Sequence, residues 1–226
     1  MKNKTYLLLA ILMLFGISAN AQNTGISFGL RGGVNMQNIN GKDLSGDKLE
    51  LSMVPRFNAG IVVGIPVAPE FYFQPGLMYS AKGAKAKSEF LGLAMAAEYN
   101  ISYIELPLNF LYKPVLGNGH FFLGFGPYVA YGFGGKASFT IDGTSTETNI
   151  VFANEYQSLN PYDWKYFRRL DYGANLFFGY ELKSGLSIQL NTQLGLAKIN
   201  SANTTLPNNK SEFRNTGYGI ALGYNF

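Results

Sequence analysis

The single histidine, His120, is the first residue to weigh as a catalytic group or a metal ligand. An acyl hydrolase or transferase needs a nucleophile beside a general base, and that base is usually a histidine. His120 directly follows the turn-forming residues 117–119, so we expect a solvated turn residue rather than a catalytic base. The sequence has no cysteine, no clustered carboxylates and no phosphate-binding G-x-x-x-x-G-K-[ST] motif. We therefore expect no enzymatic activity, no metal and no cofactor.

A series of charged residues forms the second set of groups that could do chemistry. Each lies in or beside a segment where large apolar side chains alternate with small or polar ones. Such charges could relay protons or neutralise one another, depending on the elements that hold them. The seven residues are Arg31, Arg56, Glu105, Lys113, Arg169, Asp171 and Glu181.

Period-two alternation predicts that these elements are β-strands. The clearest segment is the C-terminus, where bulky residues from Tyr218 to Phe226 alternate with small or polar residues from Gly217 to Asn225. The same pattern predicts eight strands in all, which cover residues 26–36, 56–67, 71–80, 104–113, 121–133, 171–182, 186–197 and 217–226.

The links between these segments alternate strictly in length. Short links are predicted at 68–70, 114–120 and 183–185, and long links at 37–55, 81–98, 134–165 and 198–212. Outer-membrane barrels have short periplasmic turns and longer outer loops. The alternation therefore predicts that both chain termini lie on the periplasmic side.

The composition indicates which face of the predicted barrel meets lipid. Charged residues make up 14% of the chain, against roughly 25% in soluble proteins. A soluble, lipocalin-type barrel is the alternative fold, but its outward face would carry many Lys and Glu residues. Here the polar positions hold mainly Gly, Asn, Gln and Ser, whereas the bulky apolar positions would be costly in water. We therefore predict an all-β fold, an eight-stranded antiparallel up-and-down transmembrane β-barrel preceded by a signal peptide.

Aromatic residues gather near both ends of the predicted strands, as in the two girdles of outer-membrane barrels. The alternative explanation is β-propensity alone, because aromatic residues are common in any strand. Near the predicted periplasmic ends lie Phe71, Tyr112, Phe121, Tyr180, Tyr224 and Phe226, and near the outer ends lie Tyr79, Tyr131, Phe133, Tyr166 and Tyr172.

The lumen of an eight-stranded barrel is just wide enough for side chains to fill it, so no open pore is expected. By parity the seven charged residues point into this lumen, where charges must be paired. We expect Arg31, Arg56 or Arg169 to neutralise Glu105 and Asp171. This network would fix the barrel rather than relay protons.

The N-terminus has the pattern of a secretory signal peptide. Lys2 and Lys4 precede the apolar stretch Tyr6–Ile17, and Ala19-Asn20-Ala21 forms a cleavage site. An uncleaved helical anchor is the alternative, but the apolar stretch is shorter than the ~20 residues that a spanning helix needs. We expect residues 1–21 to be cleaved and residues 22–226 to form one barrel domain.

The long loops are the predicted functional surface. Link 134–165 ends in an aromatic cluster that would contact a protein or a glycan, or would anchor the barrel rim at the interface. Residues 90–97 are apolar and would extend a hairpin or fold over the barrel mouth. The aromatic candidates are Tyr162, Trp164 and Tyr166, and the candidates for contact with anionic lipid headgroups are Lys82, Lys85 and Lys87.

Several strand motifs resemble the PorT-like family of outer-membrane β-barrels. These are the segment 103–108 (YIELPL), Asp171-Tyr172-Gly173, and the final segment 217–226 (GYGIALGYNF). The resemblance covers essentially all of residues 22–226 and implies an eight-stranded barrel in the outer membrane. The founding member of that family is linked to protein secretion. Phe226, with Tyr224, is similar to the C-terminal aromatic signal that the barrel-assembly machinery recognises.

These features predict an outer-membrane protein with a structural or interaction role, accessory to protein secretion or envelope organisation. The alternative is a small ligand-binding or transport barrel. The expected partners are outer-membrane lipid, the barrel-assembly machinery and an envelope or secretion protein. No basic run indicates a nucleic acid partner, and we expect the barrel to be monomeric.

Overall fold

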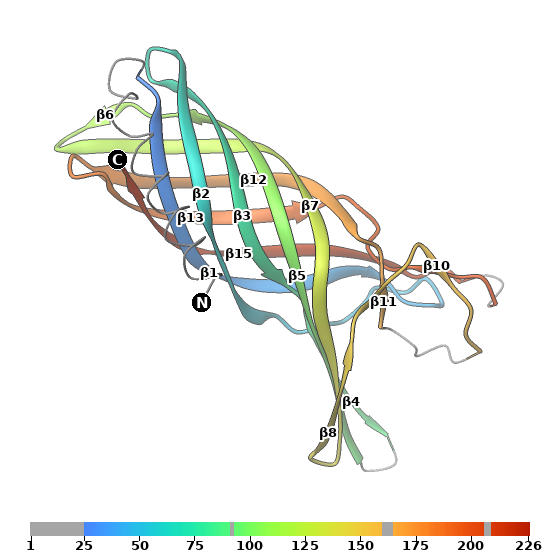
Figure 1. Cartoon of the computed structure of the whole chain (residues 1–226). Helices are drawn as coiled ribbons and strands as arrows, with labels where there is room; N and C mark the ends of the chain where they lie inside the picture. Colours follow the sequence, from blue (N-terminus) through green and yellow to red (C-terminus); the bar gives the residue numbers. More distant parts are fainter. Residues whose placement is uncertain (1–24, 91–92, 160–164, 206–208) are drawn as a thin grey trace, which may run out of the picture.

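The computed structural model describes residues 25–90, 93–159, 165–205 and 209–226, so the predicted signal peptide, residues 1–21, lies outside the described residues. Its main element is a closed antiparallel barrel of eight strands (Figure 1). This confirms the predicted all-β, up-and-down barrel. The strands are β1 (Ser27–Lys42), β2 (Val54–Ala68), β3 (Phe71–Lys82), β5 (Leu93–Tyr112), β7 (Gly119–Ile141), β12 (Leu170–Leu182), β13 (Leu186–Gly195) and β15 (Glu212–Asn225).

Each of these strands pairs with its neighbours along the chain, and the first and last strands close the ring. The pairing of β1 with β15 runs without a register shift from Gly29–Asn225 to Lys42–Glu212. The closed ring lets the backbone polar groups of the wall bond to adjacent strands, as a bilayer requires. Among the described residues, no helix is long and apolar enough to cross a membrane.

The alternation seen in the sequence becomes two faces of the wall. On β1, Leu30 and Val34 are half-exposed on the outside, whereas Asn35 and Gln37 are buried in the lumen. On β15, Tyr218, Ile220 and Leu222 are likewise exposed outward. An exposed apolar belt around a polar interior is stable in lipid and would be costly in water.

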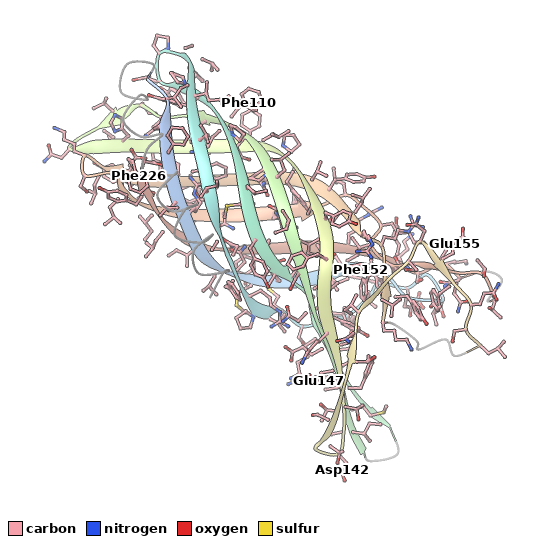
Figure 2. All side chains as sticks on the ribbon, viewed as in Figure 1. Phe110, Asp142, Glu147, Phe152, Glu155 and Phe226 are labelled. Carbon is pink, nitrogen blue, oxygen red and sulfur yellow. The ribbon has the colours of Figure 1, made fainter. Side chains whose placement is uncertain are left out.

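The links differ in length at the two ends of the barrel, as predicted. We call one end the turn end, where the links 69–70, 113–118 and 183–185 lie; β6 (Val115–Leu116) is part of the second link. The opposite end, with the links 43–53, 83–92, 142–169 and 196–211, is the loop end. In Figure 2, Phe226 lies toward the turn end and Asp142 lies far beyond the loop end.

Two short strands widen the wall at the loop end. The strand β4 (Lys85–Phe90) pairs with β5, and β8 (Thr144–Asn149) pairs with β7. Together with the adjoining ends of β5 and β7 they form a four-stranded sheet, which we call the tongue, that extends beyond the barrel (Figure 1). Phe90 ends β4 and residues 93–97 begin β5, so the described part of the apolar segment 90–97 extends a hairpin, which was one of the two predicted arrangements.

The remaining loop-end segments pack on one another. The strand β9 (Val151–Phe152) pairs in parallel with β11 (Tyr166–Phe167), and β10 (Glu155–Tyr156) pairs in parallel with β14 (Ala202–Asn203). An isolated bridge joins Phe167 to Asn200. These contacts tie link 142–169 to link 196–211.

A buried apolar cluster, the loop-end cluster, joins the barrel wall to these loops. The wall supplies inward side chains such as Tyr99 and Tyr103, and the loops supply Phe167 and Ile199. None of these four side chains is more than 2% exposed. The loops are thus held against the barrel by burial of apolar surface. The cluster consists of Ile39, Ala84, Tyr99, Ile101, Tyr103, Tyr128, Ala130, Ala137, Ile150, Phe167, Ala197, Ile199 and Phe213.

Candidate functional site

Three charged side chains meet in the lumen beside the loop-end cluster. Lys82 is the last residue of β3, and its Nζ lies 2.9 Å from Glu105 Oε2 and 3.1 Å from Asp171 Oδ2. The side chains of Lys82 and Asp171 are fully buried, and that of Glu105 is 7% exposed. Ion pairs this deep resist screening by salt.

Neutral donors complete the coordination of the two carboxylates. Asn215 Nδ2 donates to Asp171 Oδ2 at 2.9 Å, and Gln193 Nε2 donates to Glu105 Oε1 at 2.9 Å. The hydroxyl of Tyr128 donates to Asp171 Oδ2 at 3.3 Å. Its ring centroid lies 4.2 Å from Lys82 Nζ, a cation–π distance. Two carboxylates facing one ammonium leave a formal excess of negative charge, and these donors stabilise it.

The cation that serves Glu105 and Asp171 differs from the predicted one. We expected an arginine there and placed Lys82 at the lipid headgroups, and both expectations were wrong. The strand β3 continues two residues past its predicted end at Ser80, so alternation turns Lys82 inward. The continuing register of inward residues on β3 is the sequence signal that could have identified it.

The three predicted arginines lie in other places. The guanidinium of Arg31 lies 5.5 Å from the ring centroid of Phe177 in the lumen. Arg56 Nη2 bonds to Glu98 Oε1 at 2.9 Å at the loop end. Arg169 is exposed, because β12 begins only at Leu170 and the alternation does not reach it.

The Arg56–Glu98 pair fastens the start of β2 to the base of the tongue. The same guanidinium nitrogen donates to the backbone oxygen of Tyr99 at 3.0 Å. Its hydrogen bond to Glu98, more than its charge, holds the pKa of that carboxyl below its ordinary value. Lys85 adds a longer contact of 3.6 Å to Glu98.

A second ion pair closes the turn end of the lumen. Lys113 Nζ lies 2.6 Å from Glu181 Oε1, and Asn225 Nδ2 donates to Glu181 Oε2 at 2.5 Å. Of the seven charged residues in the prediction, Lys113 and Glu181 are the two that bond directly to each other. Glu181 lies on β12 and Lys113 directly follows β5, so the ion pair joins these two parts of the wall.

The lumen between these two charged layers is nearly filled. A cavity of about 70 Å³ is lined by residues including Arg31, Asn35 and Gln193, and one of about 10 Å³ lies beside Glu181. Pockets for small molecules usually span roughly 300–1,000 Å³. These lumenal cavities have room for a few waters.

The other candidate residues have no common site in the described structure. His120 is partly buried in β7, paired with Glu181, rather than exposed in the preceding turn as predicted. Tyr166 stacks on Tyr156 at 4.4 Å between ring centroids, and Tyr162 and Trp164 lie outside the described residues. No group of histidine, cysteine or carboxylate side chains that could hold a metal is present in the described part of the chain.

The C-terminal residues pack on the outside of the wall. The backbone N–H of Phe226 donates to the oxygen of Phe28 at 2.8 Å. The ring of Phe226 lies 5.1 Å from that of Tyr224, edge to face, and both rings are exposed.

Comparison with protein families and solved structures gives consistent matches. The model of the family described as "Outer membrane protein beta-barrel domain" matches residues 20–201. Neisserial surface protein A shares 11% identity over 89% of this chain and 99% of that chain, with a TM-score of 0.45. Ail of Yersinia pestis, in complex with the heparin analogue sucrose octasulfate, shares 12% identity over 89% of this chain and 99% of that chain, with a TM-score of 0.40. OprG of Pseudomonas aeruginosa shares 14% identity over 88% of this chain and 95% of that chain, with a TM-score of 0.44. No curated protein matches the chain.

Proposed function

The chain belongs to the outer membrane protein beta-barrel family, and we propose that it acts there as a structural and interaction protein. Its barrel is integral to the bacterial outer membrane. The proposed role is neither catalytic nor conductive: the barrel is a closed support that presents its loop end to a partner.

The observation that carries this proposal is the filled lumen. The Lys82–Glu105–Asp171 cluster and the loop-end cluster block one end, and the Lys113–Glu181 pair lies across the other. The cavities between them, about 70 and 10 Å³, are far smaller than a transported solute would need. The interior of an eight-stranded barrel is just wide enough for side chains to fill it, which favours a packed support over a pore.

The proposal assigns the loop end to the cell exterior and the turn end, with both termini, to the periplasm. Short periplasmic turns and long outer loops are the rule in outer-membrane barrels. Residues 1–21 would then be removed on export, and Tyr224 and Phe226 would be read by the barrel-assembly machinery. The resemblance to the PorT-like family supports a role as a monomeric accessory of protein secretion or envelope organisation.

The tongue is the proposed contact surface for an envelope or secretion protein. Its outer strands, β4 and β8, each pair with a single strand of the barrel sheet, and on the other edge of β4 its first residue, Lys85, also exchanges backbone hydrogen bonds with Ser52. The free edge of such a strand offers unpaired backbone groups to a segment of another chain.

Two measurements test this function. The purified barrel, shown to be folded by a gel shift that appears only after boiling, should give no stable conductance in a planar bilayer. A photo-crosslinker in place of Thr146 on β8 should capture a protein in intact cells, and one in place of the lipid-facing Leu222 should not. Stable open channels would instead support the transport alternative, and equal capture at both positions would remove the tongue as the contact surface.

A further inference from the structure

A cleft at the loop end lies outside the filled lumen. It has a volume of about 590 Å³ and lies where β7 and the start of β12 meet the links 142–169 and 196–211. Phe152, at the junction of the barrel with the loops in Figure 2, forms part of its wall. The cleft is large enough for a headgroup-sized ligand.

Three cations line this cleft: Arg168, Arg169 and Lys198. Within the described ranges, no carboxylate lies within ion-pair distance of any of them. The acid that acts on Lys198 through its charge is Glu212, whose carboxylate is engaged by Arg214 at 2.6 Å. As far as the described residues go, the cleft therefore carries uncompensated positive charge.

Two further features show that these cations are crowded and partly removed from water. Burial, and then the charge of Arg168, lower the pKa of Lys198 below its ordinary value. Arg168 Nε is buried and has no hydrogen-bond partner in the described structure. A buried donor without a partner is costly, and an anion in the cleft would satisfy it.

Arg169 is positioned by its neighbours rather than by an acid. Its Nη1 donates to the backbone oxygen of Gly132 at 3.3 Å. The guanidinium carbon lies 5.0 Å from the ring centroid of Phe152 and 5.6 Å from that of Tyr131. These two cation–π contacts hold the guanidinium in the cleft, and among the described residues its other N–H groups have no hydrogen-bond partner, so they can bind phosphate.

The cleft also borders the lipid-facing surface. Tyr131, Leu170 and Tyr172 line it, and each is at least half exposed on the outside of the wall. Tyrosines at this level of a barrel mark the boundary between hydrocarbon and headgroups. A ligand with a phosphate in the cleft could therefore keep its acyl chains in the membrane.

We propose that Arg168, Arg169 and Lys198 form a binding site for the phosphate monoester of an anionic outer-leaflet lipid. Only the choice of the outer leaflet rests on the orientation given under the proposed function. The site itself is defined by its positive charge and by its position at the membrane interface. Such a site would fix the rotational position of the barrel and the loops above it relative to neighbouring lipid.

The test compares three probes on the folded, detergent-solubilised full-length barrel. Native mass spectrometry or calorimetry would measure binding of a short-chain phosphatidic acid, of the phosphatidylcholine with the same chains, and of inorganic phosphate. We expect phosphatidic acid to bind at least about tenfold more tightly than either other probe. Equal binding of the two lipids would overturn the site, and inorganic phosphate binding as tightly as phosphatidic acid would overturn its assignment to lipid.

Matched variants identify the residues. The double variant Arg168→Gln/Arg169→Gln should bring phosphatidic acid binding down to the level of phosphatidylcholine, and Lys198→Gln should weaken it in part. Lys85→Gln/Lys87→Gln removes two positive charges from the tongue and should leave binding unchanged. An equal loss in the tongue variant would mean non-specific attraction and would overturn the proposal. The gel shift on boiling checks that each variant is folded, and these results are independent of conductance and cross-linking.

Discussion

Lys82 and Asp171 are 89 residues apart in the sequence, yet Lys82 Nζ lies 3.1 Å from Asp171 Oδ2 with both side chains fully buried. The pair links β3 to β12 across the lumen, and Glu105 on β5 shares the same ammonium. A cation in this position holds three parts of the barrel wall together.

Replacing Lys82 by Met should destabilise the barrel by about 3–5 kcal/mol, because two buried carboxylates lose their cation. The free energy of unfolding, measured by denaturant titration in lipid vesicles, checks this. Lys85→Met removes a lysine that is 36% exposed and should cost no more than about 1 kcal/mol. Equal losses of unfolding free energy in the two variants would show that the lumenal cluster stabilises the barrel no more than a surface lysine does.

Replacing Glu105 by Gln should have a smaller effect. Lys82 keeps Asp171, and the Gln carbonyl can accept the hydrogen bond from Gln193, but the Gln NH2 group then replaces the oxygen that faces Lys82 and that contact is lost. We expect a loss of about 1.5–3 kcal/mol, the usual contribution of a hydrogen bond to a charged group. The temperature at which the folded band disappears on gels reports it, and heat resistance equal to that of the unchanged protein would contradict this role of Glu105.

A side chain at Gly124 should destabilise the barrel. A Cβ at this position would lie 2.3 Å from the ring of Phe177, which is itself buried, so the ring would have to move. We expect Gly124→Ala to cost about 1–3 kcal/mol through overpacking. Gly134→Ala on the same strand meets nothing within 4 Å and is the control. Thermal unfolding of the two variants should separate them, and a Gly124→Ala barrel as stable as the control would contradict the packing of the lumen.

The attachment of the tongue should weaken in acid. The hydrogen bond from Arg56 lowers the pKa of Glu98 from its ordinary value of 4.5, so the folded tongue favours the ionised carboxylate. Its stabilisation is complete above the pKa of the unfolded state and is lost as the pH falls through the lower folded pKa. The effect is modest, because Glu98 is 38% exposed. Protease cleavage of the tongue should therefore rise in acid in the unchanged protein. In the Glu98→Gln variant, cleavage should vary little with pH. An equal rise in that variant would refute the role of the Arg56–Glu98 pair in attaching the tongue.

Much of the fold could be predicted because its signal is local. A lipid-facing wall demands a large apolar residue at every second position, so the pattern around Leu30, Val34 and Tyr218 identifies strands and faces from a few neighbouring residues. Link lengths then predict the order of strands around the ring. Strand ends are harder to predict, because a strand can continue beyond the lipid, where the outer face no longer has to be apolar. The strand β3 therefore runs on past Ser80 to Lys82, and β12 begins only at Leu170.

The amino-acid sequence by itself therefore determined that this chain forms an eight-stranded membrane barrel with a filled, polar lumen. Only the tertiary structure decided which charges meet. Lys82 rather than an arginine reaches Asp171, and Arg168 and Lys198 come together from separate links. The physical reason is that contacts across a lumen depend on the register and length of all the strands between the partners, which no local pattern encodes.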